Sequence, residues 1–138
     1  MTRIGETSDF QVCYALRHEV FVVEQGYTAE GEVDALDPDS LHLLAWQEGI
    51  PVATARVHIQ DGTAKIGRVC VLKNQRGLGL GADLITAAVE LAGANSADHV
   101  VLGAQAHAVG FYAKLGFEPF GEVYDDEGEP HQMMERVL

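Results

Sequence analysis

Three glycines lie within five residues near the middle of the chain. Residues 76–82 read RGLGLGA, between an apolar stretch and an alanine-rich amphipathic stretch. A helix that begins here leaves about four backbone N–H groups without intrahelical partners, backed by the positive end of the helix dipole. Gly77, Gly79 and Gly81 allow a sharp turn and let an anion approach those amides. The sequence therefore predicts a phosphate cradle in which Arg76 adds one positive charge.

Two common phosphate-binding motifs do not fit this stretch. A Walker A loop requires Lys and then Ser or Thr after its last glycine, whereas Ala82 and Asp83 follow Gly81. A dinucleotide fingerprint has the spacing G-x-G-x-x-G and opens a parallel βαβ unit, whereas antiparallel strand signals precede these glycines. A glycine-rich turn that only permits close packing of a helix on a sheet stays open as an alternative.

Alternating and helical apolar patterns predict the elements that position the cradle. We expect strands over 41–46, 51–59 and 64–72, with turns at Glu48-Gly49 and Asp61-Gly62. Leu80, Leu84, Ala88 and Leu91 form the stripe of a helix, and Gly93 is a candidate C-cap.

Apolar patterns before residue 41 and after residue 98 predict further helices and strands. A helix is expected from Ser8 to Val22, followed by a polar stretch to Ser40 that has room for a short helix and is long enough to be functional. Beyond the central helix we expect a strand over 99–104, a helix over 107–116, and strands over 117–121 and 129–138. The fold class is α/β in an α+β layered arrangement: a mixed, mostly antiparallel central sheet flanked by helices on both faces.

Length, composition and charge restrict the class of protein. The chain has 138 residues, 47% of them hydrophobic, so one domain over 1–138 is expected. A net charge of −12 disfavours a nucleic-acid partner, and no apolar run is long enough for a membrane span. The first ten residues lack the apolar region of a signal peptide. Cys13 and Cys70 have no disulfide or metal spacing, so we expect a cytoplasmic protein without a metal.

Two segments in order carry a resemblance to a known family. The Arg76–Gly81 segment resembles the R-x-x-G-x-G motif of the GNAT superfamily of N-acetyltransferases. Residues 105–117, QAHAVGFYAKLGF, resemble the second signature of that family, N-x-x-A-x-x-F-Y-x-K-x-G-F, with Gln105 in place of asparagine. The segments LRHEVFVVEQG, DPDSLHLLAW and EPHQMMERVL are similar to an ElaA-like and YjcF-like bacterial branch. The resemblance covers most of the chain and implies a GNAT fold.

This resemblance implies acetyl-CoA as the co-substrate and an amine as the acceptor. The amides of residues 76–82 would take the pyrophosphate, and the backbone of Val69–Val71 would pair with the pantetheine arm. The cofactor-binding residues are then Val69, Cys70, Val71, Arg76, Gly77, Leu78, Gly79, Leu80, Gly81, Ala82, Gln105, Ala108, Phe111 and Tyr112. Direct transfer is expected rather than an acyl intermediate on Cys70, because no Cys–His–Asp signature accompanies that cysteine.

Acetyl transfer requires an acid for the leaving thiolate and a base for the attacking ammonium. Tyr112 occupies the position of the acid in the family. Glu24 and His131 are the first candidates for the base, with His107 a third, since a histidine titrates near neutrality and a carboxylate would need its pKa raised by burial. Arg56 and Arg68 are expected either to line the acceptor site or to pair with nearby acids.

Two alternatives to a small-amine acetyltransferase remain at this point. One is a catalytically weak acyl-CoA-binding or sensor module that has retained the cleft. The other is a glucosamine-phosphate-type acetyltransferase, although no basic cluster in the first third would hold a phosphosugar. The expected partners are a small-molecule or peptide amine and, by analogy with the superfamily, a second copy in a homodimer.

Overall fold

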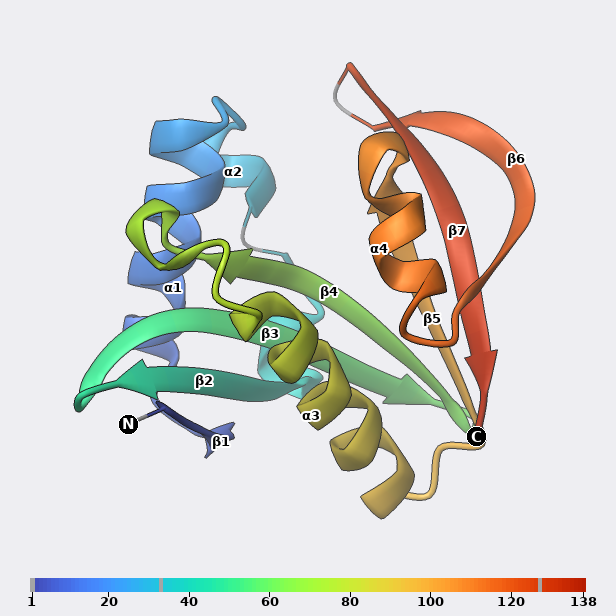
Figure 1. Cartoon of the computed structure of the whole chain (residues 1–138), viewed down its shortest axis with the longest axis horizontal. Helices are drawn as coiled ribbons and strands as arrows, with labels where there is room; N and C mark the ends of the chain where they lie inside the picture. The colour runs from blue at the N-terminus through green and yellow to red at the C-terminus, as the bar shows by residue number, and fades with distance from the viewer. Residues whose placement is uncertain (1, 33, 127) are drawn as a thin grey trace.

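The chain folds around one twisted seven-stranded sheet with helices on both faces, as expected (Figure 1). The structure is a computed structural model, and it describes residues 2–32, 34–126 and 128–138. The strand order is β1-β2-β3-β4-β5-β7-β6. Neighbouring strands are antiparallel except β4 and β5, which run parallel. The sheet is therefore mixed and mostly antiparallel.

Seven strands form the sheet, and the four in the middle of the chain match the apolar patterns there. They are β1 (Thr2–Thr7), β2 (Leu41–Gln47), β3 (Ile50–Gln60), β4 (Thr63–Val71), β5 (His99–Gln105), β6 (Glu118–Asp126) and β7 (Glu129–Val137). The expected turns are present at Glu48-Gly49 and Asp61-Gly62. All four of these residues have positive φ angles of 50° to 79°, which is the geometry of tight hairpin turns.

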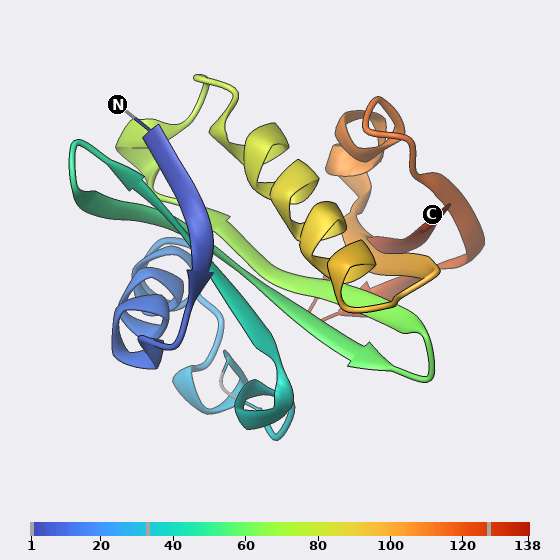
Figure 2. The same ribbon diagram turned by 90° about the horizontal axis from the view of Figure 1, so that it is seen from below.

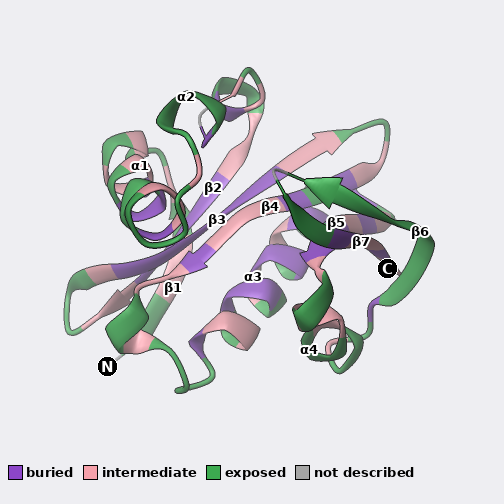
Figure 3. Cartoon of the chain, turned by 90° about the horizontal axis from the view of Figure 1, so that it is seen from above, coloured by how far each residue is buried: buried purple, intermediate pink, exposed green. Residues whose placement is uncertain are grey.

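The helices cover opposite faces of the sheet (Figure 2). Helix α1 (Phe10–Arg17) begins where the Asp9 side chain accepts a hydrogen bond from the Val12 amide, and it continues as a π-helix over His18–Glu24. The loop that follows holds α2 (Ala29–Glu32) and a 3-10 turn over Asp37–Asp39. On the other face lie α3 (Leu80–Ala94) and the short α4 (Val109–Ala113) (Figure 3).

Three details differ from the sequence-based expectations. Strand β1 was not expected, because its six residues are largely polar and lie at the sheet edge. Strand β6 extends five residues beyond the expected Gly121. Gly93 is not the C-cap: α3 continues to Ala94, and Ser96 instead adopts the left-handed conformation with φ 68°. Asn95 supports this end, since its side-chain amide donates to the Leu91 carbonyl.

Two apolar clusters hold the helices on the sheet. The larger one packs buried residues of α3, among them Leu84, Ile85 and Ala88, against β3, β4 and β5. The smaller one places Cys13, Leu16 and Val20 of the N-terminal helix on Leu44 and Cys70. Both faces of β3 and β4 are therefore covered (Figure 3), which fixes the central strands between two layers.

Candidate active site

A cleft opens where β4 and β5 part. Their parallel pairing begins at Thr63↔His99 and ends at Ile66↔Leu102, and the strands then diverge (Figure 1). A bulge in β4 increases the divergence, because Arg68 and Val69 lie opposite the single residue Ala55 and Arg68 takes φ 51°. A cavity of about 400 Å³ fills the gap, with residues of both strands, α4, β6 and β7 in its wall.

The glycine loop lies at the start of α3, as the sequence predicted for its backbone. Gly77 and Gly79 have φ angles of 83° and 80°, conformations that L side chains rarely adopt. A Cβ added at either residue would meet no atom within 4 Å, so the loop is open on its outer side. Gly79 is the N-cap of α3 and provides no side-chain hydrogen bond to the first turn. The geometry fits an anion held by backbone amides.

The two signature segments meet at this helix end. A Cβ added at Gly81 would lie 3.6 Å from Cζ of Phe111, the residue before Tyr112 on α4. The ring of Phe111 packs edge-on against Tyr112 with 5.1 Å between centroids. Tyr112, Gln105 and Ala108 line the cavity. The structure therefore brings together the loop and the aromatic pair, which are about thirty residues apart in the sequence.

Tyr112 has the protonation state that an acid needs. Burial raises the pKa of its hydroxyl above the usual value for tyrosine, so the group stays neutral at pH 7 and can donate a proton. Its ring is fixed on the other side by Phe117, at 6.1 Å between centroids.

The candidate bases are in different surroundings. His131 is 8% exposed and lines the cavity, and its Nδ1 lies 2.9 Å from the Glu129 carbonyl. Because a carbonyl oxygen only accepts, Nδ1 donates in this contact, and Nε2 lies 4.0 Å from a carboxylate oxygen of Asp126. His107 is exposed and bonds to Gln105.

Glu24 does not line the cavity. Its carboxylate forms a two-pronged ion pair with Arg76, at 2.6 and 2.7 Å. The hydrogen bonds from Arg76 lower the pKa of Glu24, which is opposite to the change that a base requires. Arg76 also donates from Nε to the Val71 carbonyl at 3.0 Å. The positive charge expected from Arg76 is thus compensated by the Glu24 carboxylate.

Cys70 is directed away from the cavity, into the cluster beneath α1. Burial raises the pKa of its thiol to about 12, so a thiolate nucleophile is not formed near neutral pH. This agrees with the expectation of direct transfer. Val69, its neighbour on β4, lines the cavity.

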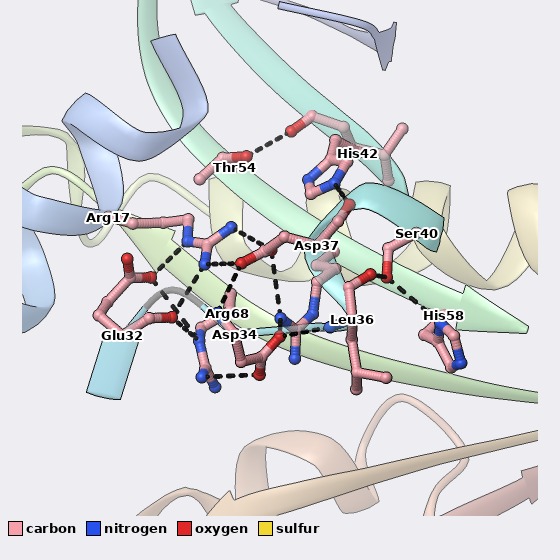
Figure 4. A network of polar contacts seen from close by, with 12 residues as sticks. Arg17, Glu32, Asp34, Leu36, Asp37, Ser40, His42, Thr54, His58 and Arg68 are labelled. Atoms are coloured by element: carbon pink, nitrogen blue, oxygen red, sulfur yellow. Dashed lines mark hydrogen bonds and ion pairs between the residues drawn. The ribbon is translucent and has the colours of Figure 1, made fainter. Parts of the chain in front are cut away.

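The far wall of the cavity is built from a buried network of charges (Figure 4). Arg17, only 1% exposed, donates to both carboxylate oxygens of Asp37 at 2.8 and 3.0 Å and also pairs with Glu32. Arg56 pairs with Asp34 at 2.7 Å and with Asp37 at 3.2 Å. The network ties the loop between α2 and β2 to the sheet, and so shapes the end of the cavity.

Arg56 and Arg68 pair with nearby acids, one of the two alternatives expected for them, and they also lie at the cavity. Each lines the cavity, and each pairs with acids of the loop: Arg68 donates to the Glu32 carbonyl at 2.8 Å and to Asp34 at 3.2 Å. Burial alone would raise the pKa of Asp37, but hydrogen bonds from Arg17, the Asp34 amide and Arg56 hold it well below its usual range.

The sequence did not single out several residues of the wall. Arg17, Glu32, Asp34 and Asp37 were missed as a network, and Tyr124 was missed as a cavity residue. The one signal was the long acidic loop before residue 41, whose acids have no visible partners until the chain is folded.

Comparison with known proteins establishes the family. The Acetyltransferase (GNAT) domain model matches residues 6–138, so the chain belongs to the GNAT family and is an N-acetyltransferase. It is 39% identical over 122 residues to the uncharacterized N-acetyltransferase YjcF of Bacillus subtilis, covering 88% of this chain and 87% of that protein.

Two solved structures are similar to this chain over its whole length and support the same family. The crystal structure of Escherichia coli ElaA is 35% identical with a TM-score of 0.88, covering 99% of both chains. An acyl-CoA N-acyltransferase from Pseudomonas aeruginosa is 36% identical with a TM-score of 0.85, again covering 99% of both. The chain is thus of the ElaA-like branch, and its fold implies a CoA-based donor. No helix among the described residues is long and apolar enough to cross a membrane.

Proposed function

We propose that this protein transfers the acetyl group of acetyl-CoA to a primary amine of a small molecule or peptide, directly and within a ternary complex. The observation that carries the proposal is the meeting of Gly81 with Phe111, which sets the open helix end beside the Tyr112 cavity. Residues 76–82 would hold the pyrophosphate by backbone amides, and the edge of β4 at Val69–Val71 would pair with the pantetheine arm. The thioester supplies an activated acyl group.

The reaction needs two proton transfers, and we assign each of them to one residue of the cavity. The amine nitrogen forms a bond to the carbonyl carbon while the carbon–sulfur bond breaks, so one proton leaves the amine and one reaches the thiolate. His131 accepts the first at Nε2, and Asp126 stabilises the resulting imidazolium. Tyr112 donates the second. We place Glu24 outside this step, because Arg76 holds its carboxylate ionised.

The charges of the cavity favour a neutral or cationic amine over a phosphosugar. Among the described residues, three cations line it, Arg56, Lys65 and Arg68, against the three carboxylates of Glu32, Asp34 and Asp126. Two of the cations, Arg56 and Arg68, are already paired with Asp34. The cavity therefore has no surplus of positive charge for a phosphate, which argues against the glucosamine-phosphate alternative.

The decisive variant is Tyr112→Phe, assayed by thiol release with acetyl-CoA and a panel of amines. We expect kcat to fall by roughly 100-fold or more, while the rise in melting midpoint with acetyl-CoA is retained. Tyr14→Phe, on α1 and outside the cavity lining, is the matched control. Wild-type protein that binds acetyl-CoA but turns over no amine would support the sensor alternative instead.

We further propose that residues 1–138 form one domain and that the protein is cytoplasmic. We also propose that it forms a homodimer along the β6 edge. All of β6 is exposed, with Phe120 and Val123 at 38% and 61%, and β6 is an outer strand of the sheet. Sedimentation equilibrium tests the dimer: Val123→Lys is expected to yield a monomer, and a monomeric wild type would refute it.

A further inference from the structure

Two glycines lie where the cleft begins. Ile66 and Leu102 are the last paired residues of β4 and β5, and Gly67 and Gly103 follow them. Ile66, Leu102 and Ala104 are buried in the core that packs against α3. Because side chains alternate along a strand, positions 67 and 103 face the opposite side, toward the charged wall. The missing side chains leave space on that side of the sheet.

The phenol of Tyr124 fills the space above Gly103. A Cβ added at Gly103 would lie 2.4 Å from the Tyr124 hydroxyl, so any larger residue there would displace the ring. The hydroxyl donates only a weak hydrogen bond, to Sδ of Met133 at 3.5 Å. Tyr124 is thus seated directly on β5 by the absence of a side chain at residue 103.

An irregularity in β6 sets this position. Phe120 pairs with Met133 and Tyr124 pairs with His131, so residues 121–123 lie opposite the single residue Gln132. The Gln132 amide donates to the carbonyls of Phe120 and Gly121 at 2.7 and 3.1 Å, which holds the irregular segment. The bulge directs the Tyr124 ring toward β5, although β6 as a whole is exposed.

Tyr124 shares the cavity with the proposed acid and base. It lines the same space as Tyr112 and His131, and its ring centroid is 5.7 Å from that of His131. If a pantetheine arm extended along β4 from the glycine loop, past Val69, its thioester would lie near Gly67. The acyl group would then project toward the point where the strands part, where Tyr124 lines the cavity.

We propose that Tyr124 determines donor selectivity: seated on Gly103, it occupies the space where β4 and β5 part and restricts the transferred group to a short acyl chain. The inference rests on the proposed function, because it assumes an acyl-CoA held along β4. Each additional methylene would have to enter the volume of the phenol, and one methylene at a filled pocket changes selectivity by about 10- to 200-fold.

The test compares acetyl-, butyryl- and hexanoyl-CoA in wild type, Tyr124→Ala and Tyr124→Phe. The readouts are kcat/KM with one amine and, without any amine, the shift in melting midpoint with each acyl-CoA. We expect wild type to favour acetyl over hexanoyl, Tyr124→Ala to reduce that ratio by roughly tenfold or more, and Tyr124→Phe to keep it, since the ring volume is unchanged.

Phe120→Ala is the matched control, because Phe120 lies on the same strand with 38% exposure against 37% for Tyr124, and is not in the cavity lining. Tyr124→Leu replaces the alanine variant if that variant does not fold. An acetyl-to-hexanoyl ratio in Tyr124→Ala within twofold of wild type overturns the inference and leaves the proposed function intact. No melting shift with any of the three donors in wild type overturns both.

Discussion

The two ends of the cleft are built in opposite ways. At the α3 end, Gly77 and Gly79 present bare backbone, and a Cβ added at either would meet no atom within 4 Å beyond its neighbours in the chain. At the loop end, Arg17, Asp37 and Arg56 are buried charged side chains that bind one another. A backbone site needs only a local conformation, whereas a charge network needs partners from distant segments. The backbone site can therefore be exposed to solvent, whereas the charge network forms only in the complete fold.

The largest effect is expected from breaking the network. Asp37→Ala leaves Arg17 buried without its two-pronged partner and removes a contact of Arg56. Loss of one partner of a buried pair costs about 3–5 kcal/mol, so the free energy of unfolding measured in urea should fall by that amount. Asp39→Ala, an exposed acid of the same 3-10 turn, is the control and should change little. If Asp37→Ala and Asp39→Ala lowered the free energy of unfolding equally, the buried network would not be what stabilises this end of the cleft.

Acid should weaken the same end of the cleft selectively. The folded-state pKa of Asp37 is depressed, so its stabilisation is present above the unfolded pKa of about 4 and is lost as the pH falls further. The pKa of Asp34 is shifted in the same direction: burial alone would raise it, but the hydrogen bonds from Arg56 and the Leu36 amide and the charges of Arg56 and Arg68 together lower it. The difference in unfolding free energy between wild type and Asp37→Asn should therefore shrink below about pH 4. A difference that stays constant from pH 7 to pH 3 would contradict this.

The glycine loop should show a smaller stability effect and a larger binding effect. Gly79→Ala forces an L side chain to φ 80° at the N-cap of α3, which costs about 1 kcal/mol. Because the variant shifts the amides of the first turn, acetyl-CoA affinity measured by calorimetry should fall roughly tenfold, or about 1.4 kcal/mol. Gly93→Ala, within the same helix, should stabilise by up to about 1 kcal/mol and leave affinity unchanged. Unchanged affinity in Gly79→Ala would argue against the cradle.

The smallest effect is expected at Glu24, the residue that joins the two regions. Glu24 ends the π-helix that leads into the loop holding α2, and its carboxylate pairs with Arg76 beside the glycine loop. Glu24→Gln frees the guanidinium and removes one negative charge, so acetyl-CoA should bind a few-fold more tightly, with a steeper dependence on salt. Stability should be nearly unchanged because the pair is exposed. Glu19→Gln, an acid earlier in the same π-helix, is the control.

The errors in the sequence-based prediction have local causes. Strand β1 was missed because TRIGET is short, polar and interrupted by glycine, and only pairing with β2 makes it a strand. Gly93 was taken as a helix end because glycine is favoured there, but the backbone hydrogen bonds at the end of α3 pass it and close at Ser96 and Ala97. For β1 a tertiary contact decided the outcome, and for α3 competing local hydrogen bonds did.

The sequence by itself determined what depends on neighbours along the chain. The hairpin turns, the apolar stripe of α3, the glycine loop and the aromatic pair at Phe111-Tyr112 follow from spacing and backbone conformation. Only the tertiary structure decided the rest: that β4 and β5 part after Ile66, that Glu24 binds Arg76, and that Tyr124 rests on Gly103. These contacts join residues 21 to 52 positions apart, and no local pattern specifies such a pairing, because its energy exists only once the sheet has formed.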